Sequence, residues 1–169
     1  IDIETHDISL IPFLYWPISD QQAPLSPLAV SKVNSYLRNG GMIMFDTRDA
    51  QLGAGSLNGA ALQRLTSQLE IPPLAPIEPD HVLTRSFYLL EVFPGRWAKG
   101  QLWVEAPSTL TSIEGAPFRN LNDGVTPVVI GSNDFASAWA QNPQGRPMYP
   151  VGTGARGERQ RELAKRFGV

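Results

Sequence analysis

A double glycine, an apolar run and two carboxylates together constrain the fold of this chain more than any other segment. Gly40 and Gly41 can end a helix, and the apolar run 42–45 that follows suits a buried parallel strand. Asp46 and Asp49 come where that run stops. Ligands of open α/β sheets bind in the crevice at the carboxyl ends of the strands. The segment therefore predicts an α/β fold with a binding site near these carboxylates.

The composition describes an ordinary soluble globular domain and excludes several classes of function. A chain of 169 residues with 42% hydrophobic residues is large enough to bury a core without staples. A net charge of −2 argues against a nucleic-acid-binding domain, which is usually basic. The absence of cysteine excludes disulfides, thiolate catalysis and cysteine-rich metal sites. No run reaches the ~18 apolar residues of a membrane span, so we expect no direct membrane contact from this segment.

Charge is distributed unevenly along the chain. Residues 1–84 carry four basic and nine acidic side chains, whereas residues 85–169 carry ten and seven. The basic half can favour an anionic ligand or partner, although a solvated face is the simpler interpretation. The chain lacks an initiating methionine and ends on an apolar Phe167-Gly168-Val169. We therefore expect residues 1–169 to form a single domain that is a fragment of a longer protein.

Local signals predict helices and strands in alternation. Ser26 can cap a helix that has Pro27 at its first position and ends at Gly40. Leucines and alanines four residues apart predict a second helix over 57–70, and a proline-rich stretch, 72–79, predicts a loop. Buried strands are expected at 8–17, 42–45, 87–91, 102–105 and 127–131.

Two more helices are expected in the second half. One covers 135–141, where Asn133 or Asp134 can cap it, and one covers 156–166, where Glu162 can pair with Lys165 or Arg166. This order of elements predicts a three-layer α/β sandwich with a mainly parallel sheet.

The strongest candidate site follows the strand at 42–45. Asp46, Arg48 and Asp49 can supply a carboxylate that acts as acid, base or hydrogen-bond acceptor. A buried Asp–Arg pair that braces the loop is an equally good interpretation. The sequence alone does not decide between these two interpretations.

Two weaker clusters accompany it. His81 and Arg85 stand just before an expected strand and can reach the same crevice, although a structural arginine is the better alternative. Asn133 and Asp134 follow the strand at 127–131, where helix capping alone explains them. Together these residues complete the set of binding candidates.

The common catalytic and cofactor motifs are missing or lack their context. There is no G-x-S-x-G elbow, no H-x-H and no H-E-x-x-H, and a Ser-His-Asp triad has only His6 and His81 available. The G-x-G-x-x-G at 152–157 lacks both a preceding strand and an acidic residue ~20 positions later. A metal site from Asp46, Asp49 and His81 is the less favoured alternative. We expect no cofactor and no metal.

A set of short motifs resembles one bacterial family. They occur in this order along the whole chain: Tyr15-Trp16-Pro17, Gly40-Gly41, Phe45-Asp46-Thr47-Arg48-Asp49, His81, Thr84-Arg85-Ser86-Phe87-Tyr88, Pro94-Gly95-Arg96, Asn133-Asp134, Ala138-Trp139-Ala140, Arg159-Gln160-Arg161-Glu162 and Arg166-Phe167-Gly168-Val169. The family is catalogued as domain of unknown function 4159. Its members are often the C-terminal part of large membrane-anchored proteins that also carry BatA-like and von Willebrand A-like regions.

The resemblance implies a fold similar to class I glutamine amidotransferases, which is a flavodoxin-like sandwich. In those enzymes the strand after the double glycine leads to an elbow with a nucleophilic cysteine, partnered later by His-x-Glu. Here that strand ends at Asp46-Thr47-Arg48, and the chain has neither cysteine nor His-x-Glu. Glutaminase chemistry is therefore excluded, because no thioester can form without a thiolate.

These observations favour a noncatalytic module of an envelope-associated bacterial protein. It would bind a partner protein or a small polar ligand at the strand-end crevice, next to other domains of the same longer chain. The alternative is a carbohydrate-active hydrolase or isomerase with Asp46 or Asp49 as base and His81 as acid. A third, purely structural interpretation places the same residues in buried ion pairs.

Overall fold

The computed structural model describes residues 1–52, 57–85, 88–106, 126–151 and 154–168. Its helices and strands are β1 (Phe13–Pro17), α1 (Pro27–Arg38), β2 (Met42–Asp46), α2 (Leu57–Thr66), β3 (Leu74–Pro76), α3 (Val82–Arg85), β4 (Trp103–Glu105), β5 (Val128–Gly131), α4 (Phe135–Trp139) and α5 (Gly154–Phe167).

The strands form one five-stranded mixed sheet in the order β1-β2-β5-β4-β3. β1, β2 and β5 run parallel, and Phe45 of β2 stands opposite Trp16 of β1 and Ile130 of β5. β4 runs antiparallel to both β5 and β3. The carboxyl ends of the three parallel strands therefore meet at one edge of the sheet, as expected for an α/β fold.

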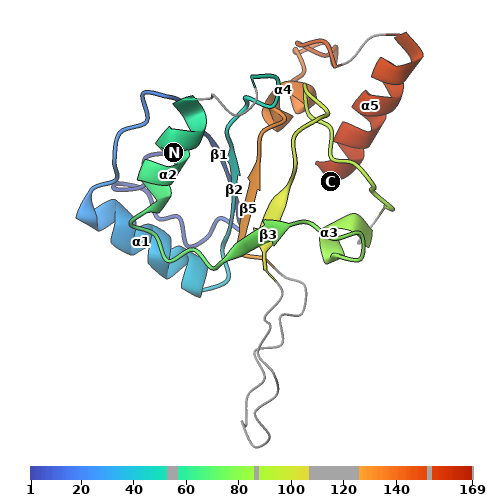
Figure 1. Ribbon diagram of the computed structural model, residues 1–169. Coiled ribbons are helices and arrows are strands. Elements are labelled where there is room, and N and C mark those ends of the chain that lie inside the picture. Colours follow the sequence, from blue (N-terminus) through green and yellow to red (C-terminus); the bar gives the residue numbers. More distant parts are fainter. Residues whose placement is uncertain (53–56, 86–87, 107–125, 152–153, 169) are drawn as a thin grey trace, which may run out of the picture.

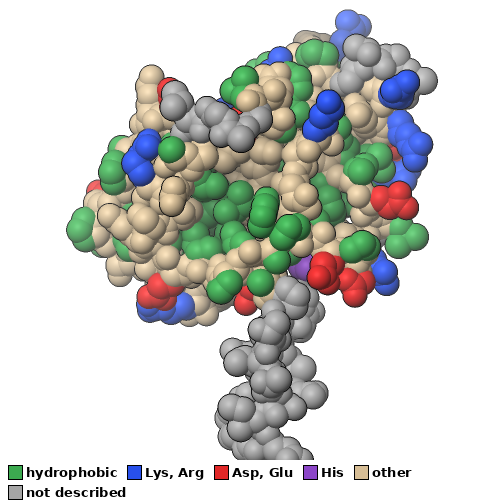
Figure 2. Space-filling view, viewed as in Figure 1, with side chains coloured by type: hydrophobic (Ala, Val, Ile, Leu, Met, Phe, Trp, Pro, Cys, Tyr) green, Lys and Arg blue, Asp and Glu red, His purple; other side chains and the backbone are tan. Residues whose placement is uncertain are grey.

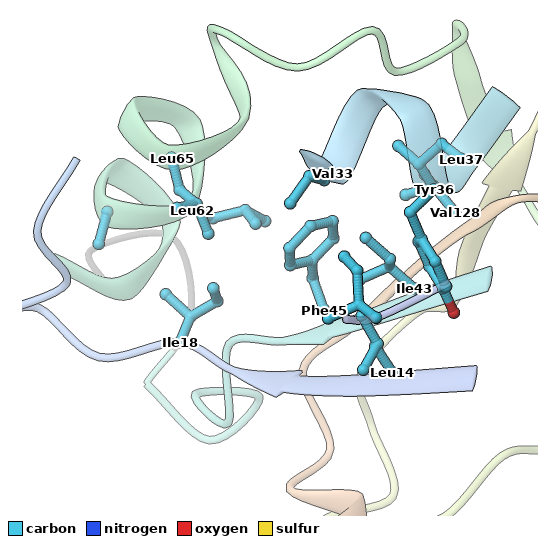
Figure 3. Packing of buried hydrophobic residues seen from close by; sticks show 12 residues of the cluster. Leu14, Ile18, Val33, Tyr36, Leu37, Ile43, Phe45, Leu62, Leu65 and Val128 are labelled. Carbon is cyan, nitrogen blue, oxygen red and sulfur yellow. The ribbon is translucent and has the colours of Figure 1, made fainter. Parts of the chain in front are cut away.

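The sheet is the middle of three layers (Figure 1). α1 and α2 cover one face, and α3, α4 and α5 lie on the other side. The side chains of β2 alternate between the two faces: Ile43 and Phe45 point into a core with α1 and α2, whereas Met44 joins a second core with Phe93 and Phe135. Figure 3 shows Phe45 surrounded by residues from both helices and β1. This confirms the predicted α/β class.

The helix signals were the most reliable. Ser26 accepts a hydrogen bond from Ala29 N at 3.2 Å and caps α1, with Pro27 at its first position. Gly40 has a φ of 88°, which explains why a glycine follows this helix. In α5 the expected pair forms between Arg166 Nε and Glu162 Oε1 at 3.1 Å.

Several other expectations were wrong or too broad. No strand occurs at residues 88–91, where Leu90 is buried as part of a loop; residues 86–87 lie outside the described part. The proline-rich stretch is not only a loop, because β3 lies within it and α3 follows directly. Pro76 fits there because β3 is an edge strand with a free side. The strand expected from residue 8 begins at Phe13, and the helix expected to residue 70 ends at Thr66.

Gly59 offers a test of how helix propensity acts on α2. It is exposed within the helix, and a Cβ added there would meet nothing within 4 Å. We expect Gly59→Ala to raise the free energy of unfolding by about 0.5–1 kcal/mol, because alanine loses less backbone entropy in a helix. Urea unfolding followed by circular dichroism measures this. A loss of stability in Gly59→Ala would contradict the assignment of residue 59 to helix α2.

Candidate functional site

Asp46 lies at the end of β2 and is completely buried. Its Oδ1 accepts hydrogen bonds from Arg48 N at 3.0 Å and Asp134 N at 3.3 Å. Its Oδ2 accepts from Tyr15 Oη at 2.6 Å and from Phe135 N at 2.8 Å. One carboxylate thus joins the end of β2 to β1 and to the segment that follows β5.

The contact with Phe135 N caps α4 from outside the helix. Asp134 occupies the N-cap position, but its side chain makes no capping hydrogen bond. The buried carboxylate of Asp46 takes that role across 89 residues of sequence. The expectation that the side chain of Asn133 or Asp134 caps this helix is therefore wrong, because a carboxylate on the neighbouring strand occupies the position.

Two residues in contact with Asp46 have a left-handed backbone. Arg48 has a φ of 57° and Asp134 a φ of 55°, and they are the non-glycine residues with positive φ in the described part of the chain. Both donate their N–H to the same atom, Asp46 Oδ1. Such conformations persist only where the surroundings enforce them, and they gather at functional sites. The strain therefore marks this end of the sheet as the candidate site.

We call this region the carboxyl edge and define it as residues 46–49, 93–100 and 132–134. Burial shifts the pKa values of Asp46 and of Tyr15, which donates a hydrogen bond to Asp46 from β1. Burial raises the pKa of Asp46, and the hydrogen bonds from Tyr15 and from backbone amides oppose that rise. Burial also raises the pKa of Tyr15, with the charge of Asp46 next in importance, so Tyr15 keeps its proton and stays a donor at neutral pH.

Arg48 and Asp49 turn away from Asp46. Arg48 Nη2 donates to Ile18 O at 2.8 Å, and the described contacts include no ion pair between Arg48 and Asp46. Asp49 is nearly buried and accepts a 2.5 Å hydrogen bond from Thr47 Oγ1. The buried Asp–Arg pair, one of the two interpretations that the sequence left open, is therefore not formed: the left-handed backbone at residue 48 directs the guanidinium to the end of β1.

Asn133 fixes a loop to the end of β5. It is 2% exposed, and its Nδ2 donates to Phe93 O at 2.9 Å and to Gly100 O at 3.1 Å. Its Oδ1 accepts from Gly100 N at 2.7 Å. All the hydrogen-bonding groups of the side chain amide are engaged in this way. Asn133 therefore positions the 93–100 loop rather than facing a ligand.

That loop brings Arg96 to the carboxyl edge, a residue not among the sequence candidates. Arg96 Nη1 lies 3.9 Å from Asp134 Oδ2, and its guanidinium lies over the rings of Trp97 and Tyr149 at 4.9 and 5.5 Å. The available signal was the Pro94-Gly95-Arg96 motif, which no periodicity singles out. Tyr15 was missed in the same way, because nothing local connects it to Asp46.

His81 and Arg85 lie elsewhere. They accompany α3, next to edge strand β3, and the order of strands places β5 and β4 between β3 and β2. Three strand spacings amount to about 14 Å. His81 Nδ1 accepts from Leu83 N at 3.2 Å, and Arg85 Nε donates to Pro79 O at 3.3 Å. Burial lowers the pKa of His81, and Asp80 opposes this. The structure does not bring either residue into contact with the Asp46 group.

A cavity of about 360 Å³ lies at the opposite end of the parallel strands. It is lined by residues 7–12, the last two turns of α1 and the double glycine that precedes β2. Lys32 on its wall is engaged by Glu4 O at 2.7 Å and His6 O at 3.2 Å. The cavity is therefore separate from the carboxyl edge.

Neither a metal cluster nor a membrane span is found in the part of the chain that the structure describes. No group of three or more His, Cys, Asp or Glu side chains converges there in a way that could bind a metal ion. None of the helices in the same ranges is both long and apolar enough to cross a bilayer. The G-x-G-x-x-G motif begins at residues 152–153, outside the described residues.

Fold and site together define a three-layer α/β domain whose strand-end carboxylate is built into its scaffold. The chain belongs to the family described as Domain of unknown function (DUF4159), whose model matches residues 1–169. This confirms the family inferred from the motifs. No curated protein matches the chain.

Proposed function

We propose that this chain is a noncatalytic binding module that recognises a ligand or partner protein at the carboxyl edge. The observation that supports this most is the state of Asp46, which is fully buried and accepts four hydrogen bonds. Its two oxygens are fully engaged with backbone and hydroxyl donors. Asp46 thus fixes the structure of the carboxyl edge, and the exposed groups around Asp46 are the ones that can contact a ligand.

Two arginines at or beside the strained positions are available at the surface of the carboxyl edge. Arg48 is exposed, and Arg96 reaches over Asp134 with about a third of its side chain exposed. Rigid presentation lowers the entropy lost on binding. A module of this kind gains affinity from a scaffold that already has its binding geometry.

The enzyme alternative has less support. A general base must come within hydrogen-bond reach of a substrate proton, and a carboxylate with no exposed surface does not do so. The proposed acid, His81, lies beside edge strand β3, and β5 and β4 separate that strand from β2. A hydrolase or isomerase that uses Asp46 or Asp49 with His81 would need both to share one open pocket.

The finer fold assignment and the cellular setting are part of the same proposal. The parallel β1-β2-β5 core with helices on both faces is compatible with a flavodoxin-like, class I glutamine amidotransferase-like fold. By resemblance to its family, we place the module in a larger, membrane-anchored bacterial envelope protein. Other domains of that longer chain are then natural partners.

The proposal is tested by a ligand screen with a mapped site. Thermal unfolding is followed with a panel of sugars, nucleotides, amino acids and divalent metals, and any hit is mapped by amide NMR shifts. We expect a ligand that raises the midpoint to perturb the amides of Arg48 and Asp134. Arg48→Ala should weaken the binding of that ligand about 5–10-fold, as expected for loss of one charged contact.

Arg85→Ala is the matched control, since Arg85 is an exposed arginine next to β3. It should leave binding unchanged. A ligand that responds to Arg85→Ala and not to Arg48→Ala would move the site to α3 and contradict the proposal. Turnover of any panel compound by the wild-type chain, abolished by Asp46→Asn, would favour the enzyme alternative instead.

A further inference from the structure

The 93–100 loop is a rigid platform for Arg96. Besides the contacts of Asn133, Arg96 N donates to Asp134 O at 3.1 Å and Trp97 N to Asn133 O at 2.9 Å. Pro94 is fully buried, and a Cβ on Gly95 would lie 2.2 Å from the carbonyl oxygen of Asn133. In Figure 1 the segment between α3 and β4, which contains the 93–100 loop, rises to α4. The backbone at Arg96 is therefore tied to the end of β5.

The side chain of Arg96 is held in one orientation, but part of its hydrogen-bonding capacity is unused. Trp97 and Tyr149 lie against its guanidinium, which restricts the plane of that group. The charged side chain that pairs with it among the described residues, Asp134, approaches Nη1 at 3.9 Å, which is beyond hydrogen-bond range. Among the described residues, Nε and Nη2 have no hydrogen-bond partner, and this pair of donors forms the side-on fork that binds an oxyanion with two hydrogen bonds.

A structural ion pair with Asp134 does not explain this arrangement. The side chain of Arg96 is 35% exposed, and ion pairs at the surface contribute little to stability. Such a pair also needs no aromatic flanks and no rigid backbone. An arginine that is immobilised before it binds loses less rotamer entropy on contact with its ligand.

We propose that Arg96 binds a carboxylate, supplied by glutamate side chains in an acidic segment of a partner protein. This rests on the proposed function of the carboxyl edge and names the ligand chemistry. A carboxylate fits better than a phosphate, because Asp134 beside Nη1 repels a dianion more strongly than a monoanion. The apolar rings of Trp97 and Tyr149 beside Arg96 suit the methylene groups of glutamate.

The surroundings favour an extended acidic segment over an isolated small ion. α4 is followed by α5, whose exposed charged side chains are four basic ones (Arg156, Arg159, Lys165 and Arg166) and two acidic ones (Glu158 and Glu162), with Glu162 paired to Arg166, so positive charge is in excess. Figure 2 shows Lys and Arg side chains gathered over α5. α4 and α5 pack together, as Trp139 Nε1 donates to Ala164 O at 2.8 Å. This field attracts acidic chains from a distance, and Arg96 supplies the directed contact.

The test is an NMR titration of the 169-residue chain with acetylated hexaglutamate, with hexaglutamine and inorganic phosphate as comparison probes. We expect saturable shifts of the Arg96 Nε–H and Trp97 indole signals with hexaglutamate and none with hexaglutamine. Arg96→Ala should weaken binding at least about 10-fold, and Arg96→Lys about 5-fold, because lysine keeps the charge and loses the fork. Arg159→Ala should change it less than about 2-fold.

Several outcomes would overturn the inference. Equal losses in Arg96→Ala and Arg159→Ala would mean diffuse attraction to the basic surface, and tighter saturation of the same signals by phosphate would mean the wrong anion. Amide spectra of the variants check whether they remain folded, and Arg96→Lys covers the case in which alanine disturbs the loop. A panel ligand that maps to Arg48 and is indifferent to Arg96→Ala would remove this inference and leave the proposed function intact.

Discussion

Asp46→Ala is expected to lower the free energy of unfolding by about 3–5 kcal/mol, because it leaves four donors without their acceptor in a buried site. The four are Tyr15 Oη and the backbone N–H groups of Arg48, Asp134 and Phe135. Two of them belong to left-handed residues that the carboxylate stabilises. Urea unfolding monitored by tryptophan fluorescence gives the value directly.

Two comparisons make this result specific. Asp46→Asn keeps one acceptor oxygen and should lose less stability than the alanine variant. Asp20→Ala is the control for a change of charge, since Asp20 is exposed and its side chain makes no hydrogen bond in the described part; it should stay within about 0.5 kcal/mol of wild type. If Asp46→Ala also stayed that close, Asp46 would not hold the carboxyl edge together, and the case for a preorganised binding surface would be lost.

The interest of Asp46 is that one group supports both fold and site. Its carboxylate links β2 to β1 through the Tyr15 hydroxyl, and links β2 to α4 through the backbone N–H of Phe135. The same oxygen that stabilises the backbone of Asp134 also places that residue beside Arg96. A loss of Asp46 should therefore disturb ligand binding through geometry, although its side chain touches no ligand.

The sequence was most informative where the signal is local. α1 has its cap, its proline and its glycine stop within a few residues of one another, and β2 follows at once. β3 was missed because its three residues end on a proline, and only the antiparallel pairing with β4 makes that arrangement a strand. Pairing between distant segments leaves no periodicity in so short an element.

The candidate site, too, was predictable only where its signal is local in the sequence. The position of Asp46 at a strand end was predictable, but its partners Tyr15 and Phe135 are 31 and 89 residues away. The expected partner, Arg48, is two residues away and turned aside by a positive φ that side-chain chemistry does not signal. Sequence proximity favoured the wrong pair, because the closest opposite charge in the chain need not be the closest in the fold.

Gly95→Ala should be the second most damaging substitution, with a loss of about 2–4 kcal/mol from overpacking against a rigid backbone. The added Cβ would meet the carbonyl oxygen of Asn133 at 2.2 Å and the carbonyl carbon of Asp134 at 2.9 Å. Neither atom belongs to a flexible side chain, so the 93–100 loop must move away from β5. Urea unfolding measures the loss, and Gly59→Ala serves as the matched control, because the same methyl group there meets open space.

The movement also predicts a functional effect that separates Gly95 from an ordinary packing site. As the loop shifts, Arg96 loses its hydrogen bond to Asp134 O and its position over Trp97 and Tyr149. Gly95→Ala should therefore weaken hexaglutamate binding about as much as Arg96→Ala does, about 10-fold, under conditions where the variant remains folded. Full binding by a folded Gly95→Ala variant would show that Arg96 needs no rigid platform, and that its preorganisation contributes nothing to recognition.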